Sequence, residues 1–101
     1  MADRPNLQTM LESLLKSRNV YFQPPSSLKL RYPCIVYELA DIDTKFADNK
    51  PYKLDKKYSV TYICYEPDDP FIDELASLPK CKFDRPFVSD NLNHFVFELF
   101  Y

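Results

Sequence analysis

The sequence contains no glycine, no tryptophan and only one histidine. Without glycine it cannot form the glycine-rich phosphate loop, the nucleophile elbow or the dinucleotide-binding turn, because each of these needs residues without a side chain. The corresponding enzyme classes are excluded. Turns with positive φ must use other residues, and we expect asparagine or aspartate in them. The candidates are Asn19, Asn49, Asn91 and Asn93.

Long apolar runs and a surplus of one charge are also absent. No run approaches the roughly 18 residues that span a bilayer, and no signal-peptide core precedes the first strand, so we expect no membrane segment. The formal charge is −2, from 13 basic and 15 acidic residues, which argues against a general polyanion binder. We interpret the cysteines as reduced core thiols, because their number is odd and no two are close: Cys34, Cys64 and Cys81.

The composition that remains is typical of one folded domain. The chain of 101 residues is 46% hydrophobic and 28% charged, so we expect a single domain over residues 1–101. Eight tyrosines and eight phenylalanines make it unusually aromatic. Aromatic side chains carry large contact areas, and tyrosine adds a polar tip suited to interfaces. This composition favours a protein that meets a partner.

Hydrophobic periodicity predicts the elements of the first two thirds. Residues 4–16 carry an apolar stripe at helical spacing, formed by Leu7, Met10, Leu11, Leu14 and Leu15. Residues 20–22 and 33–39 are predicted strands. Residues 41–50 are polar and favour a long hairpin arm with its turn at 48–51. Residues 53–65 give the strongest strand signal, with one face formed by Tyr58, Val60, Tyr62 and Cys64.

The last third predicts a short helix and a hairpin. We expect Asp69 as N-cap and Pro70 as first helical residue, with Pro79 ending the helix. Its buried side is predicted to be Ile72, Leu75, Ala76 and Leu78. Strands are predicted at 80–88, with alternate positions Cys81, Phe83, Arg85 and Phe87, and at 94–101 after a turn at 89–93. The predicted fold class is α+β: an antiparallel sheet with helices packed on one face, a long hairpin arm and a C-terminal β-hairpin.

The chemical motifs are weak, and we expect no catalytic, cofactor-binding or metal-ligating residues. His94 would need a cysteine beside it to form a nucleophilic dyad, and nothing in the spacing provides one. The three cysteines and His94 are a permitted zinc ligand set, but closely spaced pairs are missing. An acidic cluster could hold a divalent ion, although we interpret it as helix-terminus and loop charge: Glu66, Asp68, Asp69, Asp73 and Glu74.

The predicted arm combines basic and aromatic residues. They are Lys45, Lys50, Lys53, Lys56 and Lys57, with Phe46, Tyr52 and Tyr58. Surfaces that bind single-stranded nucleic acid use this combination for phosphate contacts and base stacking. Four aspartates bring the arm close to neutrality: Asp41, Asp43, Asp48 and Asp55. We therefore favour an arm that makes protein contacts, with a small single-stranded nucleic-acid-binding protein as an alternative.

Four segments resemble a known family. They are residues 4–8 (RPNLQ), residues 18–25 (RNVYFQPP), residues 32–37 (YPCIVY), and residues 83–85 (FDR) with 90–94 (DNLNH). Together they resemble small structural proteins encoded by tailed bacteriophages and prophages of low-GC Gram-positive hosts. The resemblance covers most of the chain, and its specificity lies in the number and order of the motifs.

The resemblance implies a tail completion or tail terminator protein of the neck and tail. Such proteins resemble one another as α/β sandwiches that close into a ring, commonly a hexamer, on the end of the tail tube. The implied partners are other copies of the chain, the tail tube protein and the head-tail connector protein. From the residues we expect no cofactor and no membrane contact, and nucleic acid only under the alternative given above. The implied location is the host bacterial cytoplasm during assembly and then the virion. Head-completion and minor capsid proteins of the same module are similar in size and stay open as alternatives.

Ring assembly predicts where the subunits touch. A head-to-tail contact joins two different faces of the subunit, and an exposed strand or an extended arm is suited to this. We expect the subunit contact to include four residues of the arm, Phe46, Tyr52, Lys53 and Lys57. We also expect it to include two outward-facing aromatic residues, Tyr62 and Phe100. The alternative is that these aromatic residues belong to the core.

Overall fold

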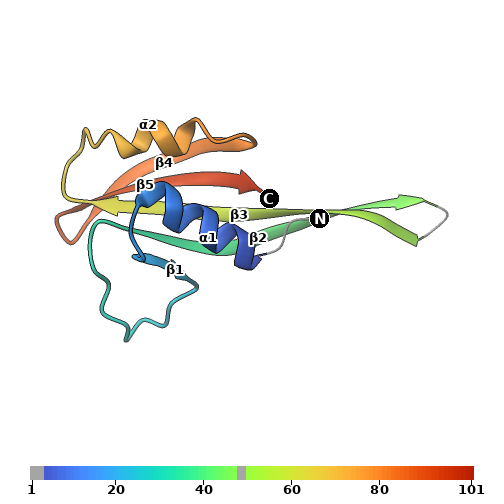
Figure 1. Ribbon diagram of the computed structural model, residues 1–101, viewed down its shortest axis with the longest axis horizontal. Coiled ribbons are helices and arrows are strands. Elements are labelled where there is room, and N and C mark those ends of the chain that lie inside the picture. The colour runs from blue at the N-terminus through green and yellow to red at the C-terminus, as the bar shows by residue number, and fades with distance from the viewer. Residues whose placement is uncertain (1–3, 48–49) are drawn as a thin grey trace.

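Five strands form one mixed sheet in the computed structural model, which describes residues 4–47 and 50–101 (Figure 1). The strand order is β1-β2-β3-β5-β4. The elements are α1 (Arg4–Leu15), β1 (Val20–Phe22), β2 (Cys34–Ala47), β3 (Lys50–Cys64), α2 (Phe71–Ala76), β4 (Cys81–Ser89) and β5 (Leu92–Phe100). The predicted α+β class is confirmed.

The prediction of a wholly antiparallel sheet is wrong at one edge. Strand β1 runs parallel to β2, with Val20 opposite Ile35, whereas the other neighbours are antiparallel. Parallel pairing requires a crossover connection. Residues 23–33 provide it, because they carry the chain back to the end of the sheet at which β1 begins (Figure 1).

Both helices pack on the same face of the sheet. Leu7 and Leu11 of α1 are buried in one cluster with Leu75 of α2 and with alternate residues of β3. Those β3 residues are the predicted Tyr58, Val60, Tyr62 and Cys64. The predicted apolar stripe of α1 and the predicted alternation of β3 are confirmed, because period 3.6 and period 2 each place one set of side chains against the other.

Helix α2 begins one residue later than predicted. Pro70 precedes it, and the Asp69 carboxylate still caps it by accepting the N–H of Phe71 at 2.9 Å. Phe71 and Leu75 are its buried residues, with Ile72 and Leu78 partly buried. The prediction that Ala76 is buried is wrong, since Ala76 is exposed.

A bulge changes the phase of β4. The register shifts between Phe83 and Arg85, so that Phe83 is opposite Phe97 whereas Arg85 is opposite Val96. Directly opposite residues share a face of a sheet. The expected single alternation from Cys81 to Phe87 is therefore wrong beyond Phe83, because the bulge moves the remaining residues to the other face.

The backbone conformations with positive φ are only partly those expected. Asp90 and Asn91 form the two-residue turn between β4 and β5 with φ of 54° and 61°, as a hairpin of this type requires. Asn19 and Asn93 do not have positive φ, and Asn49 lies outside the described residues. The other positive-φ residues of the described ranges are Lys16, Gln23 and Lys80.

Strands β2 and β3 continue beyond the rest of the sheet. Strand β3 pairs with β5 only from Lys57 onward, so its earlier residues pair with β2 alone. We call this two-stranded extension, residues 41–47 and 50–56, the arm; it leaves the body along the long axis of the molecule (Figure 1). The molecule measures 51 × 28 × 24 Å along its principal axes.

Candidate functional site

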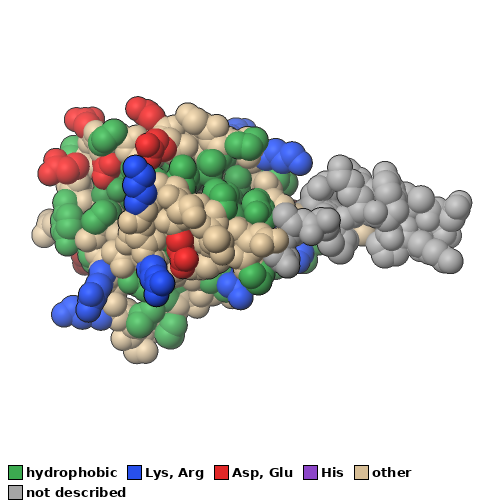
Figure 2. Space-filling view, viewed as in Figure 1, with side chains coloured by type: hydrophobic (Ala, Val, Ile, Leu, Met, Phe, Trp, Pro, Cys, Tyr) green, Lys and Arg blue, Asp and Glu red, His purple; other side chains and the backbone are tan. Residues whose placement is uncertain are grey.

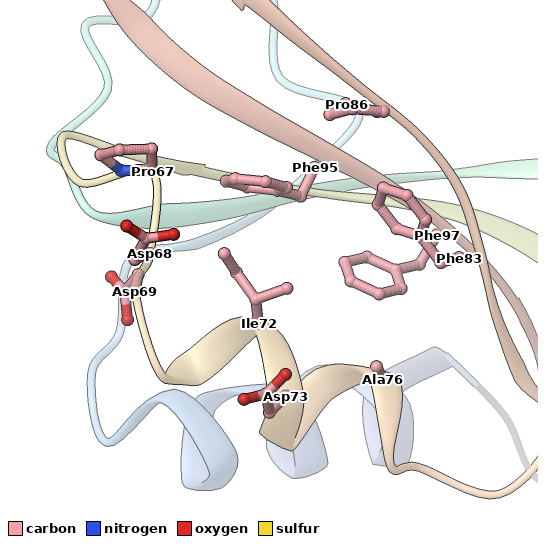
Figure 3. Close-up of a pocket in the computed structure, with 10 residues that line it drawn as sticks. All are labelled: Pro67, Asp68, Asp69, Ile72, Asp73, Ala76, Phe83, Pro86, Phe95 and Phe97. Carbon is pink, nitrogen blue, oxygen red and sulfur yellow. The ribbon is translucent and has the colours of Figure 1, made fainter.

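A groove lies between α2 and the edge strand β4, on the helix-covered face of the sheet (Figure 3). Its volume is about 410 Å³. Binding pockets commonly have volumes of about 300 to 1,000 Å³. We call this site the α2–β4 groove.

The floor of the groove is aromatic. Phe95 and Phe97 of β5 and Phe83 of β4 lie beside Ile72 of α2 (Figure 3). The rings of Phe83 and Phe97 are 5.3 Å apart between centroids, at an interplanar angle of 66°. Phe97 is fully buried, whereas 43% of Phe83 is exposed. The bulge after Phe83 produces this arrangement, because it leaves Phe83 opposite Phe97 and brings Pro86 opposite Phe95, so that both residues of β4 line the groove.

The rim of the groove is acidic. Asp68 and Asp69 lie in the loop before α2, and Asp73 lies on α2 itself (Figure 3). Acidic side chains gather over α2 and the preceding loop, at the end of the body away from the arm (Figure 2). Asp68 and Asp73 are exposed, and neither forms an ion pair within residues 4–47 and 50–101. An apolar floor with a negative rim is complementary to a segment that carries aromatic and basic side chains.

Tyr62 fastens the acidic loop to the sheet. Its hydroxyl donates a hydrogen bond to the Asp69 carboxylate at 2.7 Å, and its ring packs on Phe71 with centroids 4.7 Å apart. Burial, and then the neighbouring Asp69 carboxylate, raise the pKa of Tyr62 far above its usual range. The same carboxylate caps α2, so this one residue sets the position of the rim relative to the floor.

The predicted outward position of Tyr62 is wrong. Only 1% of Tyr62 is exposed, because its side chain points to the face that the helices cover. The side chain of Tyr62 therefore holds Asp69 at the rim of the groove, and it is not available for contact with a neighbouring subunit.

Two other predicted contact residues lie side by side at the base of the arm. Lys57 is opposite Phe100 in the pairing of β3 with β5. The Lys57 ammonium lies 3.8 Å from the Glu98 carboxylate, and 41% of Phe100 is exposed. The side chains of the remaining three predicted contacts lie outside the described residues: Phe46, Tyr52 and Lys53.

The cysteines and His94 are not brought together. Cys34 is opposite Ile63, which is opposite His94. Two strand spacings of about 4.8 Å therefore separate Cys34 from His94 across the sheet. His94 instead stacks on Phe87 with ring centroids 4.5 Å apart, and its Nδ1 lies 3.1 Å from the Leu92 carbonyl oxygen. Burial raises the pKa of the Cys34 thiol to about 12.

The geometry of the described part of the chain does not support the metal-ion hypotheses. No group of three or more histidine, cysteine, aspartate or glutamate side chains there is arranged to hold an ion. This covers the acidic cluster considered from the sequence, in which the Asp69 carboxylate is engaged by Tyr62 and by the N–H of Phe71.

The groove itself was not predicted from the sequence. Its parts come from the 67–69 loop, α2, β4 and β5, which only the fold places together. The signal that points to it is the acidic cluster, considered together with the alternating aromatic residues Phe95 and Phe97 on a strand that follows. Alternation identifies the shared face, but it does not identify the helix that borders it.

Edge strand β4 is a second open surface. Every residue from Lys82 to Ser89 is exposed, among them Phe87 at 41% and Val88 at 69%. Pro86 lies within it, as is usual for an edge strand, because proline cannot donate to a neighbouring strand. The outer side of β4 therefore has unpaired backbone groups next to the α2–β4 groove.

Comparison with known proteins gave no relatives: no family model, no curated protein and no solved structure matches the chain. Among the described residues, no helix combines the length and the apolar character needed to cross a membrane.

Proposed function

We propose that this protein is a structural subunit of the neck or tail of a tailed bacteriophage, acting as a tail completion or tail terminator protein. In this proposal several copies form a ring on the end of the tail tube, stop its growth and present a surface to the head connector. The ring assembles in the host bacterial cytoplasm and remains in the virion.

The observation that carries the proposal is the arm. Its strands pair with each other and form no ladder with β1, β4 or β5, and a backbone hydrogen bond from Tyr101 to Lys56 joins its base to the end of the chain. Ordering such a two-stranded extension costs conformational entropy, which contacts with a neighbouring subunit would offset. Such an extension is suited to contact with a neighbour, and the exposed edge at β4 is a second, different surface.

The resemblance of four sequence segments to phage neck and tail proteins supports the same role. The fourth segment lies at the β4–β5 hairpin, and the other three lie at the start of α1 and around β1 and β2. The resemblance implies a sandwich subunit that closes into a ring, and we propose that the arm and the C-terminal hairpin take part in that ring.

Electron microscopy of particles made without the protein tests the proposal. A missing terminator should leave tail tubes of irregular, excessive length without heads. A missing head-completion or joining protein should leave tubes of normal length that are detached from heads. Tails of normal, uniform length joined to heads would contradict any role in the neck.

A single-stranded nucleic-acid-binding protein is the second candidate, and the basic and aromatic composition of the arm favours it. This alternative predicts that the affinity for single-stranded nucleic acid falls steeply as the salt concentration rises, because the protein would bind phosphates. Titration of a fluorescent single strand at low and high salt separates the two. Absence of binding at low salt would contradict the nucleic-acid alternative, and the assembly proposal would be the candidate that remains.

A further inference from the structure

We propose that the α2–β4 groove of one copy receives the distal part of the arm of a second copy, residues 44–47 and 50–54. This inference rests on the proposed function, since it names the two surfaces through which ring subunits join.

The first argument is chemical complementarity. Residues 44–54 carry three lysines and one aspartate, together with Phe46 and Tyr52. The groove offers an aromatic floor, with 43% of Phe83 exposed. Its rim offers Asp68 and Asp73, which are exposed and without an ion pair in the described part of the chain. Aromatic anchors in an apolar groove with opposite charges at its rim are the usual anatomy of a protein interface.

The second argument is the register of the arm. Lys45 stands directly opposite Lys53 in the pairing of β2 with β3. Asp43 stands opposite Asp55 nearer the body, so the positive charge of the arm lies in its distal part. A segment with this charge is complementary to the acidic rim of the groove.

The third argument is geometric, and it makes the contact intermolecular. The arm leaves one end of a molecule 51 Å long, whereas the acidic side chains over α2 lie toward the other end (Figures 1 and 2). A strand rises about 3.3 Å per residue, so the stretch from Lys57 back to Lys50 extends roughly 23 Å from the body. The arm points away from its own groove, and the groove that it meets belongs to another copy.

An arm that enters the groove of the next copy is a heterologous contact. Each copy then uses one arm and one groove, and a series of such contacts closes into a ring if the rotation between copies allows it. The inference therefore predicts that removal of either surface stops assembly, and that two differently damaged copies can still form one contact.

The test uses two variants of the full chain, measured by native mass spectrometry. In the armless variant, residues 43–55 are replaced by Asn-Gly, which joins Ile42 to Lys56, a directly opposite pair. In the groove variant, D68K/D73K, the rim is positive and the arm is intact. Each alone is expected to be monomeric, with an association constant at least about tenfold below that of the wild type. A mixture is expected to stop at a heterodimer of one copy each.

Charge reversal on both sides gives a second test. K45E/K53E should weaken assembly like D68K/D73K, and the chain that carries all four changes should recover most of the lost association. The matched control is E38K/E74K, two exposed acids that do not line the groove, which should assemble like the wild type. Far-UV circular dichroism and a thermal melt establish that each variant is folded.

Two outcomes would overturn the inference. If the wild type assembles and the armless variant does not, but D68K/D73K assembles normally, the arm binds elsewhere and the proposed function stands. If the wild type stays monomeric at every concentration, the arm does not enter the groove, and electron microscopy of particles lacking the protein still decides the proposed function.

Discussion

Asp69 is the residue that holds the candidate site together. One carboxylate oxygen accepts the hydrogen bond of Tyr62 and the other accepts the N–H of Phe71. The first bond ties the acidic loop to β3, and the second begins α2. Because a buried hydroxyl must keep its partner, the contact fixes the loop in one position relative to the aromatic floor.

Removing the Tyr62 hydroxyl should loosen this attachment. Tyr62→Phe keeps the ring against Phe71 and leaves the Asp69 oxygen without its donor, so we expect a loss of about 1 to 2 kcal/mol in the free energy of unfolding. Urea denaturation measures it. Tyr65→Phe is the control, because Tyr65 is 61% exposed and the change should be neutral. Equal stability of wild type and Tyr62→Phe would show that the bond does not hold the loop.

Alkaline pH should destabilise the protein through Cys34. Burial raises the pKa of this thiol from 9.0 to about 12, so the unfolded chain loses the proton first. The stabilisation is complete below pH 9.0 and is lost as the pH rises toward about 12, by up to about 1.4 kcal/mol per pH unit for one proton. Tyr62 acts in the same direction at higher pH, because its pKa is also raised. The urea midpoint should fall less with rising pH in Cys34→Ala than in the wild type. The same dependence on pH in both proteins would contradict a role of Cys34 in the loss of stability.

Absence of glycine leaves strain at the end of α1. Lys16 has a φ of 59° there, and the N–H of Ser17 bonds to the carbonyl of Glu12 across it. Glycine is the residue that usually takes this position, since it has no Cβ to clash. We expect Lys16→Gly to raise the free energy of unfolding by about 0.5 to 1 kcal/mol, measured by urea denaturation. Arg18→Gly, at a residue without positive φ, should lower it instead; stabilisation by both would refute the explanation.

At the scale of elements, local pattern was predictive where one face is buried. The alternation of β3 and the stripe of α1 predicted the buried residues, because burial of one face imposes the period directly. The phase of β4 was not predictable, since the bulge at Asp84 is decided by pairing with β5. The direction of β1 was not predictable either, because three residues carry no signal for a parallel or an antiparallel neighbour.

The same limit applied to the candidate site. Tyr62 was predicted both in a buried alternation and as an outward contact, and only the position of α2 over β3 decides between them. The partial exposure of Phe83 likewise depends on a bulge and on a helix edge, neither of which the order of residues specifies.

The arm should be dispensable for the fold of the body. Its strands form no ladder with β5, β4 or β1, so the armless variant described above keeps every other strand pair. We expect its circular dichroism spectrum to differ from that of the wild type only by a smaller strand content. Its free energy of unfolding should stay within about 1 kcal/mol of the wild-type value. A variant that fails to fold would mean that the arm contributes to the core.

At the scale of the whole molecule, two unlike surfaces lie toward opposite ends of one long axis. The arm is at one end, and the acidic groove beside the exposed β4 strand is toward the other (Figures 1 and 2). This polarity distinguishes a subunit that joins head to tail from one that forms a symmetric pair, in which each copy presents the same patch. The molecule therefore has the two unlike surfaces that the proposed ring requires.

The native mass of the wild-type chain, measured beside that of the armless variant over a range of concentrations, tests this account most directly. It predicts one discrete multimer for the wild type and a folded monomer for the armless variant. Equal masses for the two proteins at every concentration would contradict it.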